Sequence, residues 1–173
     1  MKVGSVISAT ADRYGIEFDN EADKERLLLC YYLTEREIAE NYIPLLAMQD
    51  FTCDKEGRIF YRDFHILPIR IVGVYDKNGV SVKYTIHHNC ITVPTVGEYT
   101  VHYHYTPKEK KLEDACEYDL FAKDCLVCGI AAEHFLLCGD IEGAELATMD
   151  YKRHLQQLYK KSRFLKCTQG KWV

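Results

Sequence analysis

The sequence lacks any apolar run of about 18 residues, the length that a membrane-spanning helix needs. Its first residues, MKVGSVISATADRYG, carry one lysine and no long apolar core, so they do not resemble a secretory signal peptide. Over 173 positions, 47% of residues are hydrophobic and 28% are charged. These proportions are typical of a folded protein with one core, or one core with an appended subdomain.

Common catalytic signatures are also absent. The sequence contains no glycine-rich phosphate loop, no Gly-Xaa-Ser-Xaa-Gly and no His-Glu-Xaa-Xaa-His. Glu133 and His134 are adjacent but have no partner motif, and no pair of carboxylates is singled out by its spacing. We therefore expect no catalytic residue, cofactor or metal, and we favour a non-enzymatic protein.

Cysteine is plentiful, but its pattern does not indicate disulfide bonds. The eight cysteines are scattered, and a chain without an export signal is expected to keep its thiols reduced. Cys125 and Cys128 form a Cys-Xaa-Xaa-Cys, which in thioredoxin-like proteins begins a helix whose dipole lowers the thiol pKa. Here we expect the motif in the middle of an apolar helix, where cysteine acts as a small hydrophobic residue.

Charge is unevenly placed along the chain, whose net charge is −4. Residues 151–173 contain seven Lys or Arg and no Asp or Glu, so this end carries +7 and the remainder −11. A chain so polarised is expected to present different ends to different partners. For the basic end we favour docking to an acidic protein partner over direct binding of nucleic acid, and both over a simply solvated helix face.

The spacing of apolar residues predicts two helices near the start of the chain. The first is expected to end at Gly15, a C-terminal cap. The second is expected to be capped by Asp19 or Asn20 and to end near Asn41, because Pro44 disfavours helix in the residue before it. The apolar face of the second helix is expected to contain Leu27, Tyr31, Thr34 and Ile38.

From about residue 45 the pattern predicts a small antiparallel β unit of five or six strands. Two extended segments flank a turn at residues 54–57. Residues 69–86 are typical of a hairpin, with strands at 69–75 and 80–86, since Asn78-Gly79 supplies the positive φ that tight turns need. Two further extended segments, 90–93 and 98–105, follow.

After Pro107 the strand pattern stops. A charged connection leads to a long apolar helix expected over 117–138 and ended by Gly139, after which Asp140 caps another helix. Residues 162–173 are expected to form a basic tail or a last extended segment. The sequence thus predicts an α+β fold in one domain: a bundle of N- and C-terminal helices (1–44 and 107–161) with an inserted antiparallel β meander or sandwich (45–106).

The stretch GEYTVHYHYTPKEK contains two histidines, His102 and His104, which on a strand share one face. A zinc site needs three or four ligands, and the candidates nearby are His87, His88 and Cys90. The interpretation that we favour is a half-buried antiparallel strand. Its inward face would be formed by Tyr99, Val101, Tyr103 and Tyr105.

Three stretches share the organisation of one family. A helix leads into the β unit at residues 20–42. A strand, an Asn-Gly turn and a Gly-Xaa-Tyr-Xaa-Val-Xaa-Tyr strand closing in proline occupy 67–107. Two helices separated by Gly-Asp, the second ending in tyrosine and lysines, occupy 118–161. In these stretches the chain resembles the head-to-tail adaptor (connector) proteins in the neck of tailed bacteriophages, from which its cysteine content departs.

The resemblance implies a non-enzymatic structural protein of the virion neck, present in the host cytoplasm during assembly. Many copies, commonly twelve, would form a ring on the portal that extends the DNA channel and provides the docking platform for the tail. The partners implied are further copies of the chain, the portal protein, and the tail or next neck protein. Packaged DNA would pass through without sequence-specific binding, and no membrane is involved.

A ring subunit needs unlike lateral faces and unlike axial ends, which a polarised chain can supply. We expect the C-terminal helix and tail to dock in a portal crevice, ordering on binding. The β unit would meet the tail-side partner by hairpin contacts or strand addition. The portal-docking residues are expected to be Lys152, Arg153, Lys160, Lys161, Arg163, Phe164, Lys166, Lys171 and Trp172. The tail-side residues are expected to be Lys77, Asn78, His87, His88, His102 and His104.

Other functions stay open at this point. One is another tail or baseplate structural protein of similar build. The others are a His/Cys metal-dependent or nucleotide-dependent enzyme and a nucleic-acid-binding protein.

Overall fold

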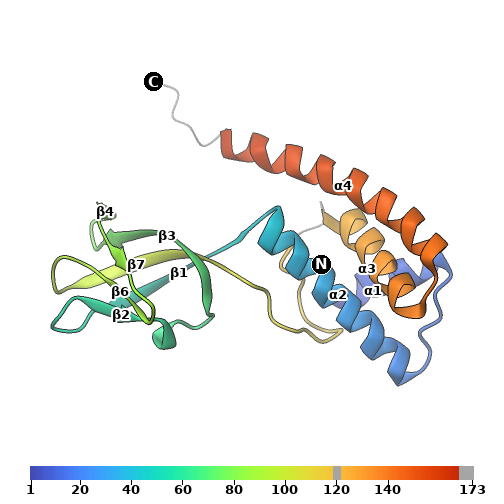
Figure 1. Cartoon of the computed structure of the whole chain (residues 1–173), viewed down its shortest axis with the longest axis horizontal. Coiled ribbons are helices and arrows are strands. Elements are labelled where there is room, and N and C mark those ends of the chain that lie inside the picture. Colours follow the sequence, from blue (N-terminus) through green and yellow to red (C-terminus); the bar gives the residue numbers. More distant parts are fainter. Residues whose placement is uncertain (119–121, 168–173) are drawn as a thin grey trace. The chain divides into compact units, whose positions relative to one another are not determined.

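The chain folds into two units, drawn in Figure 1. The computed structural model describes residues 1–118 and 122–167, with side chains as far as residue 160. Residues 1–43 and those from 107 onward form the helical unit, and residues 44–106 form the β unit. The fold is α+β, as predicted, and the β unit is inserted between the two parts of the helical unit.

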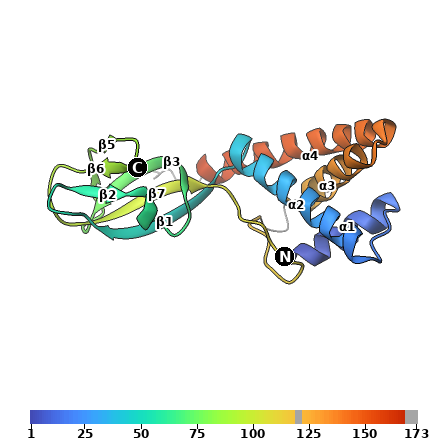
Figure 2. The same ribbon diagram turned by 60° about the horizontal axis from the view of Figure 1, so that its bottom comes forward.

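Four α-helices make up the described part of the helical unit. Their bounds are α1 Val3–Tyr14, α2 Glu21–Asn41, α3 Lys123–Cys138 and α4 Ile141–Cys167. Helix α3 packs against each of the other three (Figures 1 and 2). All residues from Cys125 to Ala132 are buried, so this helix is apolar all round rather than on one stripe. Within the described residues, none of the helices combines the length and the hydrophobicity that crossing a bilayer requires.

The helix ends follow the expected capping chemistry. Gly15 and Gly139 have φ values of 64° and 77°, in the left-handed region that favours glycine at helix ends. The Asn20 side chain accepts a hydrogen bond from the N–H of Asp23 at 2.9 Å, and the Asp140 carboxylate accepts one from the third residue after it at 2.9 Å. Helix α2 ends at its expected residue and buries the expected face: Leu27, Tyr31, Thr34 and Ile38.

The predicted start of the third helix at residue 117 is wrong. Helix α3 begins at Lys123, and the residues before it are held by contacts with α2 and the end of that helix. The Glu117 N–H donates to Glu35 at 2.9 Å, and the Tyr118 hydroxyl donates to the Ile43 carbonyl at 2.7 Å. These tertiary contacts keep Glu117 and Tyr118 out of the helix despite an apolar sequence that favours helix.

The expectation of a separate tail over 162–173 is also wrong in part. Helix α4 continues to Cys167, because no proline or glycine interrupts residues 144–169 and the segment is rich in good helix formers. Residues 168–173 lie outside the described part of the chain.

The β unit is a sandwich of two antiparallel sheets. Its strands are β1 Leu45–Thr52, β2 Arg58–Phe60, β3 Pro68–Asp76, β4 Ser81–Val82, β5 Thr85–Ile86, β6 Cys90–Thr92 and β7 Glu98–Tyr105. A four-stranded sheet has the order β1-β7-β3-β4, and a three-stranded sheet has the order β2-β6-β5 (Figures 1 and 2). The two inner faces enclose one core, which includes Phe51, Ile59, Phe64, Ile71, Val74, Ile91, Tyr99, Val101 and Tyr103.

Seven strands form where five or six were expected, because one predicted strand is divided. The segment Val80–Ile86 was expected to be continuous. Only Ser81–Val82 pairs with β3, whereas Thr85–Ile86 pairs with β6 in the other sheet. Between them the chain crosses from one sheet to the other, and Tyr84 packs against the core. The Asn-Gly turn itself forms as predicted, with Gly79 at a φ of 75°.

Strand β7 is central in its sheet and alternates as predicted. It pairs with β1 over its whole length and with β3 on the other side. Tyr99, Val101 and Tyr103 are buried in the core, and Tyr105 packs against it. The half-buried strand that we favoured for this stretch is therefore confirmed.

We predict that Gly129→Ala destabilises the helical unit. A methyl group at Gly129 would overlap the Cγ2 methyl of buried Thr34 and lie 3.1 Å from Tyr151 Cε2. Overpacking of this kind costs about 1–3 kcal/mol, which exceeds the gain of about 1 kcal/mol in helix propensity. Urea unfolding followed by far-UV circular dichroism measures the change in the free energy of unfolding.

The matched background for this test is Thr34→Ser, which removes the Cγ2 methyl and leaves the hydroxyl. Gly129→Ala should cost clearly less in that background. An equal cost in both backgrounds would show that this contact does not limit the packing.

Candidate functional site

The C-terminal part of α4 extends past the helix on which α4 packs. Helix α4 has 27 residues and α3 has 16, and the two run antiparallel on either side of the Gly139-Asp140 connection. The difference of 11 residues corresponds to about 16 Å of helix at 1.5 Å per residue. Figure 1 shows this end of α4 running beyond α3, and among the side chains described, which end at residue 160, Leu158 is the last buried one on α4.

Charge is segregated along this helix. From Asp140 to Asp150 there are four acidic residues and no Lys or Arg, whereas from Tyr151 to Cys167 there are six Lys or Arg and no acid. Acids at the start and bases at the end of a helix complement its dipole, but that effect is confined to the first and last turns. Basic residues spread over 17 positions therefore make a surface that the helix itself does not need.

The predicted portal-docking residues fall into three groups. Lys152, Arg153 and Lys160 are exposed on α4, and Arg153 is paired with Asp150, which also lies 3.6 Å from Arg13. A second group lies on α4 with side chains outside the described part: Lys161, Arg163, Phe164 and Lys166. Lys171 and Trp172 lie outside the described residues altogether.

The predicted tail-side residues lie at three separate places on the β unit. Lys77 and Asn78 are exposed in the turn between β3 and β4. His87 and His88 are exposed between β5 and β6, in the other sheet. The last two, His102 and His104, are half-buried on the outer face of β7.

The alternative metal site is not assembled from the residues proposed for it. The His102 ring packs against the Tyr75 ring in a tilted arrangement, with ring centroids 4.4 Å apart, on the outer face of the four-stranded sheet. Cys90 is 5% exposed on β6, in the three-stranded sheet. In the described residues no group of three or more His, Cys, Asp or Glu is placed to hold a metal ion.

The outer face of the four-stranded sheet is more apolar than expected. Leu46 and Met48, which pair with His104 and His102, expose 54% and 66% of their surface, and Val72 on β3 is also exposed. β1 is an edge strand of its sheet. The sequence held a signal for this face, since Leu45, Leu46 and Met48 make both sides of β1 apolar. Apolar side chains next to a strand edge suit contact with another protein.

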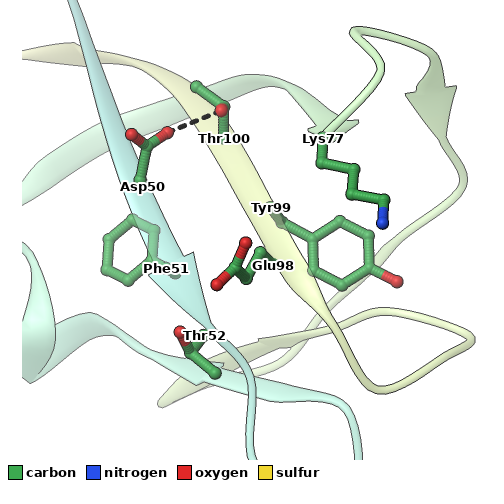
Figure 3. A pocket seen from close by; sticks show the side chains of 7 residues that line it. All are labelled: Asp50, Phe51, Thr52, Lys77, Glu98, Tyr99 and Thr100. Atoms are coloured by element: carbon green, nitrogen blue, oxygen red, sulfur yellow. Dashed lines mark hydrogen bonds between the residues drawn. The ribbon is translucent and has the colours of Figure 1, made fainter.

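A polar depression lies where β1 ends and β7 begins (Figure 3). Its volume is about 430 Å³, and the Thr100 hydroxyl donates to the Asp50 carboxylate at 2.6 Å within it. Lys77 reaches it from the β3–β4 turn. The lining residues are Asp50, Phe51, Thr52, Lys77, Glu98, Tyr99 and Thr100. Exposed hydroxyl, carboxylate and ammonium groups give this place hydrogen-bonding capacity, but it holds no buried acid, base or nucleophile.

The prediction that the Cys-Xaa-Xaa-Cys motif lies in the middle of its helix is wrong. Because α3 begins at Lys123, Cys125 and Cys128 lie in its first two turns. Both thiols are almost fully buried. Burial, with a smaller effect of Cys128, raises the pKa of Cys125 to about 12, so its thiol stays protonated at neutral pH. The prediction that these residues act as small hydrophobic side chains rests on this burial, not on mid-helix position.

The most strongly buried carboxylate belongs to Glu35, whose residue is fully inaccessible. Its Oε1 accepts from the Tyr31 hydroxyl at 2.5 Å and from the Glu117 N–H at 2.9 Å. Its Oε2 lies 3.6 Å from Lys110 Nζ, an ion-pair distance that is too long for a hydrogen bond. Lys110 also donates to the Ala115 carbonyl at 2.7 Å. These contacts fasten the segment that returns from the β unit onto α2.

The electrostatics of this cluster are dominated by desolvation. Burial raises the pKa of Glu35, and the hydrogen bonds from Tyr31 and Glu117 and the charge of Lys110 oppose the rise only in part. Burial likewise raises the pKa of Tyr31. A perturbed carboxyl can indicate an active site, but this one is enclosed by protein groups that already use its oxygens. We therefore assign this cluster a structural role rather than a catalytic one.

His134 is the other buried titratable group of the bundle. Burial lowers its pKa, so the imidazole is neutral, and its Nε2 lies 3.6 Å from Cys138 Sγ. Cys138 is exposed, and in the described part of the chain no group forms a hydrogen bond with the buried Nδ1 of His134. This contact therefore lacks the third group that orients the base of a catalytic Cys–His pair.

The raised pKa of Glu35 predicts a pH dependence of stability. A raised folded-state pKa contributes stability below the unfolded value, near 4.5, and this contribution is lost as pH rises through the folded-state pKa. The wild type should therefore lose stability relative to Glu35→Gln as pH increases above about 4.5. Urea unfolding at several pH values between about 4 and 8 measures the difference.

The control is Glu21→Gln, which removes a carboxylate whose side chain is 81% exposed. Its stability should follow that of the wild type at every pH. A constant difference between the wild type and Glu35→Gln would contradict the assigned direction of the pKa shift.

Comparison with known proteins identifies no family for this chain. The chain matches no protein-family model, and a search of curated proteins finds no match.

Proposed function

We propose that this protein is a structural component of a tailed-bacteriophage virion, a head-to-tail adaptor. Its copies would form a ring of about twelve beneath the portal, extend the DNA channel and provide the docking platform for the tail. The observation that carries the proposal is the basic C-terminal part of α4, which extends past α3. The resemblance in the order of elements supports it.

The basic part of α4 suits docking to an acidic crevice. A helix offers a preformed shape, so little backbone order has to be gained when it inserts. Lys152 and Lys160 are exposed and form no ion pair in the described part of the chain. Their charge is therefore available to steer association and to pair with carboxylates of the portal.

The β unit suits the contact with the tail-side partner. It has its own core, so it can present a surface without depending on the helices. Leu46 and Met48 offer an apolar strip beside the edge of β1. An extended segment of the partner can add to such an edge through main-chain hydrogen bonds. The polar depression at the end of β1 offers further hydrogen-bonding groups.

The docking proposal is tested by removing four charges from the end of α4. In this variant Gln replaces four residues: Lys160, Lys161, Arg163 and Lys166. We expect its binding to portal-containing heads to weaken at least about tenfold, because several steering and pairing charges are lost together. Co-sedimentation with heads, at two salt concentrations, measures the affinity.

The matched control removes four exposed lysines elsewhere. It replaces by Gln the residues Lys55, Lys83, Lys108 and Lys111. The control should bind heads like the wild type. Equal binding by both variants would reject α4 as the anchor, and binding to tails but not to heads would favour another tail component.

The ring is tested separately. Mixed with portal, the chain should form complexes with about twelve copies per portal ring, seen by electron microscopy. A complex with one or two copies per portal would contradict the adaptor proposal.

A further inference from the structure

The outward face of α4 has a pattern of its own. The face that packs on the bundle contains Ala144, Ala147, Tyr151, Leu155 and Leu158. At 100° per residue, the opposite face is a continuous stripe, which we call the α4 stripe. The α4 stripe consists of Glu142, Leu146, Met149, Arg153, Gln156 and Lys160.

The α4 stripe contains two large apolar side chains in solvent. Leu146 is 63% exposed and Met149 is 69% exposed, one turn apart on a helix whose bundle contacts lie on the other side. Glu142 and Lys160, at the two ends of the stripe, form no ion pair in the described part of the chain. An apolar centre between unpaired charges of opposite sign is typical of a helix with a partner.

The order of residues in the stripe identifies the partner. Glu142 and Lys160 lie equally far from Tyr151 on either side, and so do Met149 and Arg153. If two copies of α4 run antiparallel about a two-fold axis that crosses the stripe at the level of residue 151, each acidic end faces the basic end of the other copy. Such self-complementarity is what an isologous contact requires.

We infer that the α4 stripe is a contact surface for a second copy of this chain, with the two α4 helices antiparallel. Glu142 pairs with Lys160 of the second copy, and the two-fold axis generates a second, identical pair between Lys160 and Glu142 of the second copy. The aliphatic part of Arg153 covers Met149 of the second copy, while its guanidinium keeps its own Asp150. A parallel pair would instead place like charges together.

The residues of this contact predict a low binding affinity. Two exposed ion pairs and four apolar side chains bind weakly, and salt screens the ion pairs. We therefore expect a dimer that forms at micromolar concentration and dissociates more readily in high salt.

This inference does not rest on the proposed function, but it has a consequence for it. Arg153 and Lys160 belong both to the α4 stripe and to the proposed portal-docking surface. A copy paired through α4 cannot dock at the same time. The dimer would then hold free copies apart from the portal until the portal competes for α4, a consequence that does rest on the proposed function.

Charge reversal tests the pairing directly. Glu142→Lys and Lys160→Glu each turn both ion pairs of the homodimer into like-charge contacts, so each should weaken dimerisation about tenfold or more. An equimolar mixture of the two variants should dimerise again, because the heterodimer has two opposite-charge pairs: the original Glu142–Lys160 pair and one pair with its signs exchanged. Analytical ultracentrifugation measures the affinities, and native mass spectrometry with one variant isotopically labelled identifies the heterodimer.

The control mixes Lys160→Glu with Glu21→Lys, a reversal at an exposed position on α2. This mixture should form a heterodimer that is weaker than the heterodimer of the two stripe variants, because it combines one Glu142–Lys160 pair with one like-charge contact. Far-UV circular dichroism checks that each variant is folded. Because both reversals are on the surface, a folding defect in one can be bypassed with Glu142→Gln and Lys160→Gln, which should each weaken the dimer less than the reversals do.

Three results would overturn the inference: a wild-type chain that stays monomeric at high micromolar concentration, a dimer insensitive to the reversals, or a mixture that does not recover. The proposed function would fail in a different way. Glu142 is outside the docking surface, so Glu142→Lys should bind heads at least as well as the wild type if the adaptor proposal is right.

Discussion

The burial of α3 on every side is the constraint on which the helical unit depends. Every residue from Cys125 to Ala132 is buried, so α3 needs neighbours all around it. Helices α1 and α2 come from the chain before the β unit, and α4 comes from the chain after it. Neither part can cover α3 alone. The bundle therefore closes only when the chain has returned from the β unit, and the contacts of Lys110 with Glu35 and Glu117 fasten the returning segment.

Helix α4 has surface that does not pack against the rest of the bundle. One face of α4 covers α3, and its buried residues recur at spacings of three and four: Ala144, Ala147, Tyr151, Leu155 and Leu158. Helix α4 is 11 residues longer than α3. The outward apolar side chains Leu146 and Met149 lie on the side of α4 away from the bundle and do not contribute to its core. Features that cost solubility and do not serve the fold are best explained by a partner.

Local chemistry decided which parts of the fold were predictable from the sequence. The caps at Gly15, Asn20 and Gly139 and the Asn-Gly turn depend on a few neighbouring residues, and all of them form as expected. The start of α3 was not predictable, because hydrogen bonds to Ile43 and Glu35, distant in the sequence, decide it. The division of Val80–Ile86 between two sheets likewise depends on the packing of the whole sandwich.

The candidate sites differ in the same way: one could be predicted from the sequence, and the others depend on tertiary packing. The basic part of α4 could be found from the sequence, since charge is a property of the residues wherever they lie. The exposure of Leu46 and Met48 could not, because both sides of β1 are apolar and only the position of the second sheet decides which side is covered. The α4 stripe needed both kinds of information: the order of charges from the sequence, and the bundle face that shows which side of the helix is left open. A helix with acids at one end and bases at the other has two ways to satisfy its charge, an antiparallel copy of itself or an acidic partner at its basic end. Because both of the proposed contacts use Arg153 and Lys160, one copy of the helix could not make them at the same time.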